Sequence, residues 1–258
     1  GAQLVAKFFP TVTRYRYTPE MKSRLVMQAQ QIIKDGGKDV LNSVLPVLEQ
    51  VTNWQAHDIE SAVKSYAEAQ GLKLVYTLET HVHADHVTGA DTLRQKLGSK
   101  SVVHRDAGAM CGDLLVTDGV HIIVGTIDLE VRYTPGHTNG CISFFAGDRI
   151  FTGDSLLIGG CGRTDFQQGN SGQLYDSIQN QIFSLPDEVI VYPGHDYNGN
   201  TQSTVGEERK NNKRLGGGKS REEFIQIMSE LKLAYPKYID VALPANQACG
   251  RVIPGQAA

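Results

Sequence analysis

The sequence has no long hydrophobic run, no signal-peptide pattern and no excess of charge of one sign. No apolar stretch approaches the roughly 20 residues that a membrane-spanning helix needs. The N-terminus lacks the charged-then-apolar layout of a secretory signal. Lysine and arginine total 25 and aspartate and glutamate total 28, which gives a net charge of −3. We therefore expect neither a membrane nor a nucleic acid among the partners of this chain.

Cysteine is also scarce. The chain has only Cys111, Cys141, Cys161 and Cys249, and no two of them have CxxC spacing. A chain of 258 residues can bury a sizeable core without covalent cross-links. We therefore predict four free thiols in a reducing compartment, three of them acting as small buried hydrophobic side chains.

What is present is an alternation of helical and strand-like segments. Periodicity and capping signals predict helices over residues 58–70, 88–97, 173–185 and 220 to about 233. Strands are predicted over residues 72–78, 101–103, 114–116, 121–124, 126–133, 141–146, 149–151 and 189–192. The pairs Asp118-Gly119 and Gly147-Asp148 are hairpin signals. Near the N-terminus, residues 12–17 alternate like a strand and residues 21–34 resemble a helix. This order favours two sheets packed face to face with helices outside.

Metal-binding side chains follow several of these strands. Three of the eight histidines lie within six residues, and three further sites lie at later strand ends, where loops carry chemistry. Imidazole and carboxylate groups suit zinc, iron or manganese. A structural role in the core or on the surface would readily explain a single isolated histidine. It explains this run of histidines less well. The candidate ligands are His81, His83, Asp85, His86, His137, Asp154 and His195.

The run from Thr80 to Gly89, THVHADHVTG, resembles the signature of the metallo-β-lactamase superfamily. The resemblance implies an α+β fold, an αββα sandwich of two packed mixed sheets flanked by helices, with the metal at one edge. We assign residues 1–258 to a single domain of this kind. Residues 1–50 form an atypical N-terminal segment of it.

Three later motifs resemble the persulfide dioxygenase family within that superfamily. They are GCGRTDFQ at residues 160–167, YPGHDY at 192–197, and LPAN at 243–246 with Cys249-Gly250. The likeness extends from about residue 71 to residue 251. The N-terminal third departs from the family pattern, because Leu45 stands where an aspartate is expected. The resemblance implies that glutathione persulfide is oxidised with O₂ and water to sulfite and glutathione.

The resemblance also assigns roles to residues. It implies that His81, His137 and Asp154 bind one Fe(II) ion as a facial triad, which leaves positions open for the substrate and O₂. His83, Asp85, His86 and His195 would orient these ligands and waters, or bind a second metal in hydrolase relatives. Arg163 and Tyr197 match glutathione-binding positions. The alternatives are a salt bridge from Arg163 to Asp165 and simple packing for Tyr197.

Two other functions remain open at this stage. One is a dinuclear zinc or iron hydrolase that cleaves hydroxyacylglutathione thioesters, like glyoxalase II, because ligands for two metals are present. Little chain follows residue 246, however, for the helical extension that glyoxalase II usually has. The other is a non-catalytic relative that binds metal or glutathione. By resemblance we also expect a homodimer, in the mitochondrial matrix or the cytoplasm.

Overall fold

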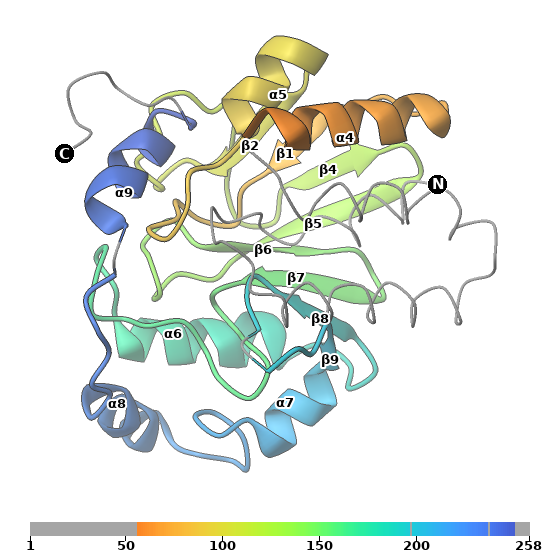
Figure 1. The fold of residues 1–258 in the computed structure, drawn as a ribbon. Helices are drawn as coiled ribbons and strands as arrows, with labels where there is room; N and C mark the ends of the chain where they lie inside the picture. Colours follow the sequence, from red (N-terminus) through yellow and green to blue (C-terminus); the bar gives the residue numbers. More distant parts are fainter. Residues whose placement is uncertain (1–55, 197, 237, 251–258) are drawn as a thin grey trace.

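The structure is a computed structural model that describes residues 56–196, 198–236 and 238–250. Two sheets pack against each other, and helices cover their outer faces (Figure 1). This is the αββα arrangement that the sequence predicts. The strand expected over 12–17, the helix expected over 21–34 and the unusual Leu45 lie outside the described residues.

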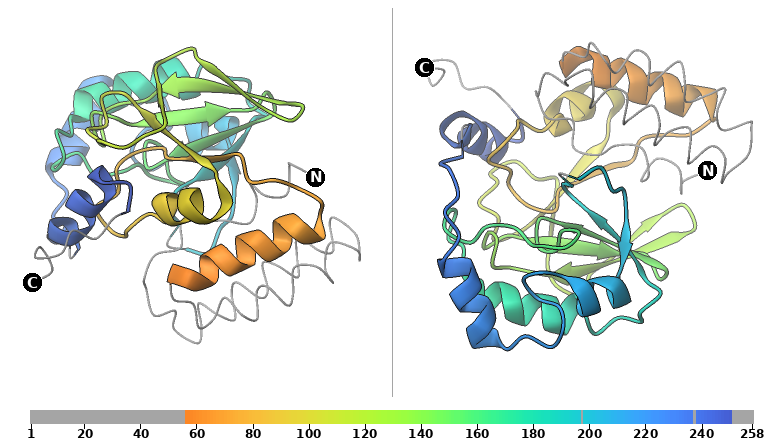
Figure 2. Two further views of the ribbon diagram at one scale, coloured as in Figure 1. Left: turned by 90° about the horizontal axis from the view of Figure 1, so that it is seen from above. Right: turned by 60° about the horizontal axis from the view of Figure 1, so that its bottom comes forward.

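The first sheet has three described strands, and all of them are parallel. Parallel neighbours need a crossover connection, and helix α5 (Ala90–Leu97) supplies it between the first two strands. Helix α5 ends at Gly98, whose left-handed conformation closes the last turn. Helix α4 (Ala56–Ala69) lies beside α5 on the outer face (Figure 2). The strands are β1 (Tyr76–Leu78), β2 (Lys100–His104) and β3 (Leu114–Val116).

The second sheet has six strands among the described residues, in sequential order and antiparallel except for one parallel pair, β7 with β8. Its strands are β4 (His121–Val124), β5 (Ile127–Tyr133), β6 (Ile142–Phe145), β7 (Arg149–Gly153), β8 (Ile190–Pro193) and β9 (Ser203–Thr204). Helices cover the face away from the first sheet (Figure 1). They are α6 (Ser171–Ser177), a π-helical turn η1 (Ile178–Ile182), α7 (Val205–Asn211) and α8 (Arg221–Ser229).

The two hairpin predictions have opposite outcomes. Gly147-Asp148 joins β6 to its antiparallel neighbour β7, so that hairpin is confirmed. Asp118-Gly119 instead leads from β3 in one sheet to β4 in the other, so the second hairpin is wrong. The reason is tertiary, because β3 pairs with β2 while the amide of Gly119 donates to Val131 on β5.

Most helix predictions are confirmed to within a few residues. The capping box of Ser220 and Glu223 opens α8, because each side chain accepts a hydrogen bond from the other residue's backbone amide. The helix predicted over 173–185 is observed as α6 followed by η1. Two helices were not predicted, α7 and the C-terminal α9 (Ile239–Gln247). Helix α9 contains Pro244, a residue that normally argues against a helix interior.

Two hydrophobic clusters hold the layers together. The cluster between the sheets joins Val102 of β2 to Val131 and Phe144 of the second sheet. The other cluster joins Ile150 of β7 to the covering helices through Leu174, Ile178 and Phe224, among others. Because the second sheet contributes to both clusters, its strand ends are held rigidly where the candidate metal ligands follow.

We expect Ile150→Ala to lower the free energy of unfolding by about 2–5 kcal/mol, because the side chain is fully buried and its loss leaves a cavity. Thermal unfolding should show a melting temperature lower by about 2–4 °C for each kcal/mol. Ile123→Ala on β4 is the matched control, since that side chain is 59 % exposed. Equal shifts for the two variants would contradict this description of the core.

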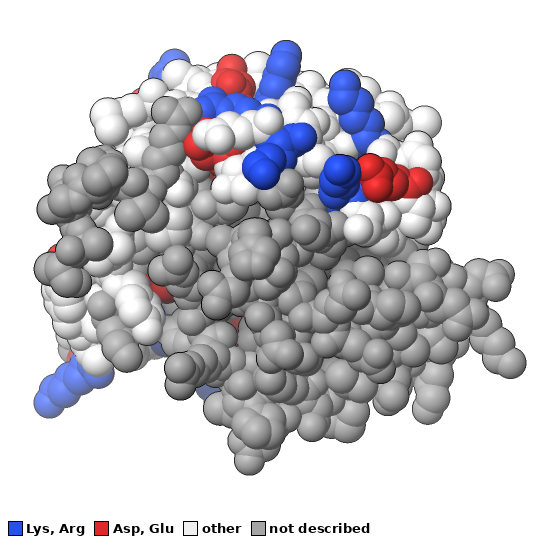
Figure 3. Space-filling view, turned by 45° about the horizontal axis from the view of Figure 1, so that its top comes forward, with Lys and Arg blue, Asp and Glu red and all other residues white. Residues whose placement is uncertain are grey.

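The described helices and one face of the surface can be compared with the charge and hydropathy of the sequence. None of the helices in the described ranges is both long and apolar enough to cross a bilayer. Figure 3 shows basic and acidic side chains mixed over one face, and neither sign forms a continuous patch among the described residues there.

Candidate metal centre

The fold brings four loops to one edge of the sandwich. Strands β5, β7 and β8 run in the same direction, because β6 separates β5 from β7 and β7 is parallel to β8. Their C-terminal ends therefore lie at one edge. His137, Asp154 and His195 follow these ends, and His81 follows β1 of the other sheet. This convergence is the reason that residues more than 100 positions apart can form one site.

One group of three side chains is arranged to bind a metal ion. Ligand atoms of His81, His137 and Asp154 all lie within 4.8 Å of one another. His137 Nε2 is 3.8 Å from Asp154 Oδ2. Asp154 Oδ1 is buried and has no hydrogen-bond partner. An unsatisfied buried carboxylate oxygen is costly, and a cation at this point would satisfy it. The donor set therefore fits a metal.

A second group lies beside the first. Ligand atoms of His83, Asp85 and His86 also lie within 4.8 Å of one another. His195 Nε2 lies between the groups, 3.4 Å from Asp85 Oδ2 and 3.6 Å from Asp154 Oδ2. The structure thus brings together all seven ligand candidates that the sequence identified, as two adjacent groups of three with His195 between them.

The rings of the first group are oriented by backbone and hydroxyl groups. His137 Nδ1 donates to the carbonyl oxygen of Arg163 at 2.7 Å, so Nε2 carries the lone pair that faces Asp154. His81 Nδ1 lies 3.1 Å from Thr80 Oγ1. Burial and the neighbouring histidines hold the pKa of His81 well below its usual value. Its imidazole is therefore neutral, the form that binds metals.

Close approach of the loops depends on Gly162. The amide of Gly162 donates to the carbonyl of Asp154 at 2.7 Å. A Cβ at this position would lie 2.4 Å from that carbonyl oxygen and 2.8 Å from the His137 ring. Any larger residue would push the Asp154 carbonyl and the His137 ring away. The second glycine of the GCGRTDFQ motif, Gly162, is therefore needed for packing of the site.

Glu79 is a site residue that the sequence analysis missed. Its Oε2 lies 3.5 Å from His83 Nε2, and its Oε1 accepts a hydrogen bond from Thr88 Oγ1 at 2.6 Å. Burial alone would raise the pKa of Glu79, but His83, together with the hydrogen bond from Thr88 and the charge of His86, outweighs it and the pKa is lowered. Burial alone would lower the pKa of His83, but Glu79, with smaller effects from Asp85 and Asp154, outweighs it and the pKa is raised. The position of Glu79, two residues before His81, could have identified it as a candidate site residue from the sequence.

Asn246 connects helix α9 to the histidine run. Its Nδ2 donates to the carbonyl oxygens of His83 at 2.8 Å and His86 at 2.7 Å. Its Oδ1 accepts from the backbone amide of Thr88 at 2.8 Å. Asn246 is buried, so these three bonds satisfy the amide and fix the loop that carries His83, Asp85 and His86.

Of the two predicted substrate residues, the structure describes the contacts of Arg163 only. Arg163 makes the ion pair with Asp165 that was the alternative interpretation, with Nε 2.6 Å from Oδ1 and Nη2 2.7 Å from Oδ2. Its Nη1 also donates to the carbonyl of Ala234 at 2.8 Å. The glutathione contact of Arg163 stays a prediction. Tyr197 lies outside the described residues, so its role stays a prediction too.

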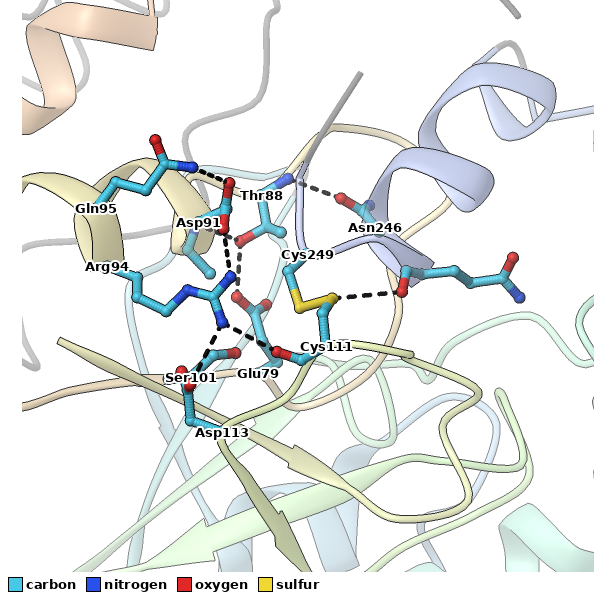
Figure 4. Close-up of a disulfide and its surroundings, with 12 residues drawn as sticks. Glu79, Thr88, Asp91, Arg94, Gln95, Ser101, Cys111, Asp113, Asn246 and Cys249 are labelled. Carbon is cyan, nitrogen blue, oxygen red and sulfur yellow. Dashed lines mark hydrogen bonds and ion pairs between the residues drawn. A yellow bond between two sulfur atoms is a disulfide. The ribbon is translucent and has the colours of Figure 1, made fainter. Parts of the chain in front are cut away.

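The prediction of four free thiols is wrong for one pair. Cys111 and Cys249 form a disulfide across 138 positions of sequence, with Cα atoms 5.9 Å apart (Figure 4). Their sequence spacing carried no signal, because folding alone brings them together. Cys141 and Cys161 are free and buried. Burial raises the pKa of each of these two thiols to about 11, so both are inert at neutral pH.

Comparison with protein families identifies two matching models. The model described as the metallo-β-lactamase superfamily matches residues 51–195. A model described as an anticodon binding domain matches residues 2–80 and so overlaps the first over residues 51–80. The second match covers the N-terminal segment that departs from the family pattern. The assignment of residues 1–258 to a single domain stays a prediction.

Comparison with individual proteins identifies similar relatives. The mouse protein named persulfide dioxygenase ETHE1, mitochondrial, is 48% identical over 220 residues, covering 83% of this chain and 82% of that protein. The human protein of the same name is 52% identical over 183 residues, with coverage of 70% and 71%. The crystal structure of ETHE1 from Myxococcus xanthus has a TM-score of 0.72 and 48% identity, covering 76% of this chain and 86% of that one.

Proposed function

The chain belongs to the metallo-β-lactamase superfamily and, within it, to the persulfide dioxygenase family, and from this we propose that it oxidises glutathione persulfide. In the balanced reaction, glutathione persulfide, O₂ and water give glutathione, sulfite and two protons. The outer sulfur is oxidised and leaves as sulfite, and O₂ is reduced. The inner sulfur stays with glutathione.

The observation that carries this proposal is the convergence of His81, His137 and Asp154 with one buried carboxylate oxygen left unsatisfied. We assign these three side chains as the ligands of one Fe(II) ion. Two imidazoles and one carboxylate are the donor set of non-haem Fe(II) oxygenases. When bound, the iron would supply a redox centre that activates O₂ and leaves room for the persulfide.

The remaining residues position these ligands. The carbonyl of Arg163 fixes the tautomer of His137. Asn246 holds the loop that carries His83 and His86. We propose that His83, Asp85, His86 and His195 orient ligands and waters rather than bind a second ion.

A polar hollow of about 50 Å³ lies next to the candidate ligands. Val82 and Thr138, which adjoin His81 and His137 in sequence, form part of its wall, together with Asp106, Asn139 and Gln167. Gln167 also donates to the carbonyl of Val82 at 2.8 Å. We propose that this hollow receives part of the glutathione peptide, while Arg163 and Tyr197 contact the rest.

A second function is favoured by one observation, the adjacent group of His83, Asp85 and His86. With two zinc or iron ions, the same edge could activate a hydroxide and hydrolyse a hydroxyacylglutathione thioester, as glyoxalase II does. The number of metal ions per chain separates the two functions.

Elemental analysis of protein purified without oxygen, combined with an oxygen electrode, tests the proposal. We expect about one iron per chain, and O₂ consumption with sulfite release when glutathione persulfide is added. Lactoylglutathione is the control substrate and should not be hydrolysed. Two metals per chain with thioester hydrolysis and no O₂ uptake would contradict the dioxygenase and establish the alternative.

We also propose a homodimer in the mitochondrial matrix. A mitochondrial location is proposed because the names of the mouse and human relatives include the word mitochondrial. The matrix and the dimer are proposed by resemblance to the family. Light scattering of the purified chain and fractionation of the source cells test these two statements separately.

The prediction that no nucleic acid binds is opposed by one finding, the match of residues 2–80 to an anticodon binding domain. A titration of the full chain with a transfer RNA mixture tests it. Saturable binding that weakens steeply with salt would contradict the prediction.

A further inference from the structure

The disulfide between Cys111 and Cys249 joins two segments that lie 138 positions apart in the sequence. Cys111 lies in the loop between β2 and β3, and Cys249 follows helix α9. The amide of Met110 also donates to the carbonyl of Gln247 at 2.8 Å. The loop is held on its other side by Arg94, whose Nη1 donates to the carbonyl of Cys111 at 3.3 Å (Figure 4). The end of α9 is thus attached to the first sheet.

The same end of α9 directly contacts the loop that carries His83, Asp85 and His86, which we call the candidate metal loop. Asn246 makes its three hydrogen bonds to the backbone of His83, His86 and Thr88. Three residues further on, the carbonyl of Cys249 accepts from the amide of Asp91 at 3.1 Å. Residues 246–250 therefore form a clamp along residues 83–91, and the disulfide is the covalent anchor of that clamp.

Helix α9 has little stability of its own. It is nine residues long, has no side-chain N-cap and contains Pro244, and helices this short are marginal without tertiary contacts. Proline also removes one backbone donor from the helix. Its position therefore depends on its buried side chains, on Asn246 and on the disulfide. Breaking the disulfide removes the only covalent one of these constraints.

The two cysteine residues differ in how far they are exposed. Cys111 is partly exposed, whereas Cys249 is 4 % exposed. A thiolate from solution therefore reaches Cys111 first. We propose that this pair is a thiol–disulfide exchange site for low-molecular-mass thiols, and that its oxidised state clamps α9 onto the candidate metal loop.

The exchange is balanced with a thiol such as glutathione as the reductant. Its thiolate attacks Cys111 Sγ, the S–S bond breaks, and Cys249 leaves as a thiolate that takes up a proton. The thiolate of a second glutathione then attacks the glutathione sulfur of this mixed disulfide, and Cys111 leaves as a thiolate that takes up a proton. The products are two protein thiols and one oxidised glutathione. This exchange is separate from the proposed oxidation and does not depend on it.

The test uses the full chain equilibrated in buffers with different ratios of reduced to oxidised glutathione. Thiol alkylation and peptide mass spectrometry should show one disulfide in oxidising buffer, four thiols in reducing buffer, and any mixed disulfide on Cys111 rather than Cys249. No Cys111–Cys249 disulfide at any ratio, or a mixed disulfide on Cys249 alone, would overturn the proposal.

Hydrogen exchange then measures the clamp without using activity. On reduction, amides in residues 81–91 and 239–250 should exchange at least about tenfold faster, while those of β5–β7 stay unchanged. Cys111→Ala should show the fast rates without reductant and should not respond to it. Unchanged rates on reduction would disprove the clamp. Faster exchange throughout β5–β7 would also disprove the clamp, because the disulfide would then stabilise the whole fold rather than α9 and the candidate metal loop. If the variant does not fold, the reduced native chain decides.

Discussion

Asp154→Ala is expected to remove both bound metal and O₂ consumption with glutathione persulfide. The carboxylate contributes one of the three donors of the first group and has an oxygen with no other partner. Loss of groups that merely orient a ligand typically costs about 10–100-fold in metal affinity or activity, so loss of a ligand should cost more than about 100-fold. Metal content and the oxygen electrode measure the two effects, and circular dichroism establishes that the variant folds.

Asp128→Ala is the matched control for this variant. Asp128 lies on β5 of the same sheet, its side chain is 57% exposed, and it pairs only with His121 among the contacts described. Exposed pairs of this kind contribute little, so metal content and activity should stay at the native level. If Asp154→Ala kept its metal and its activity, the first group would not be the metal centre. The group of His83, Asp85 and His86 would then take its place.

Gly162→Ala is expected to have the second large effect, although glycine contributes no chemical group. A Cβ there would overlap the carbonyl oxygen of Asp154 and the ring of His137 at 2.4 and 2.8 Å. Relief of such overpacking typically costs about 1–3 kcal/mol, and here it must move two candidate ligands. We expect metal affinity and turnover to fall more than about tenfold, measured by a metal titration and by O₂ uptake.

Gly160→Ala is the control from the same loop. A Cβ at Gly160 would have only Arg214 within reach, at 3.9 Å, and Gly160 is not among the glycines with positive φ. This variant should keep native metal affinity and activity. Equal losses in the two variants would mean that the loop is sensitive to any side chain, and that the close approach at Gly162 has no special role.

The amino-acid sequence by itself determined where the chemistry lies. His81, His137, Asp154 and His195 could be identified because each follows a strand, and the strands are visible in local hydrophobic patterns. The capping box at Ser220 and the turn at Gly147-Asp148 were equally local, since each depends on a few neighbouring residues. The resemblance of short motifs then supplied the family, and the comparisons confirmed it.

Only the tertiary structure decided how these pieces meet. The pairing of β3 with β2 overrode the hairpin signal at Asp118-Gly119. Helix α9 forms around Pro244, and the bonds of Asn246 to a loop about 160 positions away support it. The disulfide of Cys111 and Cys249 likewise spans 138 positions. Contacts over such separations leave no periodic trace in the local sequence, because their stability comes from surfaces that exist only once both sheets are packed.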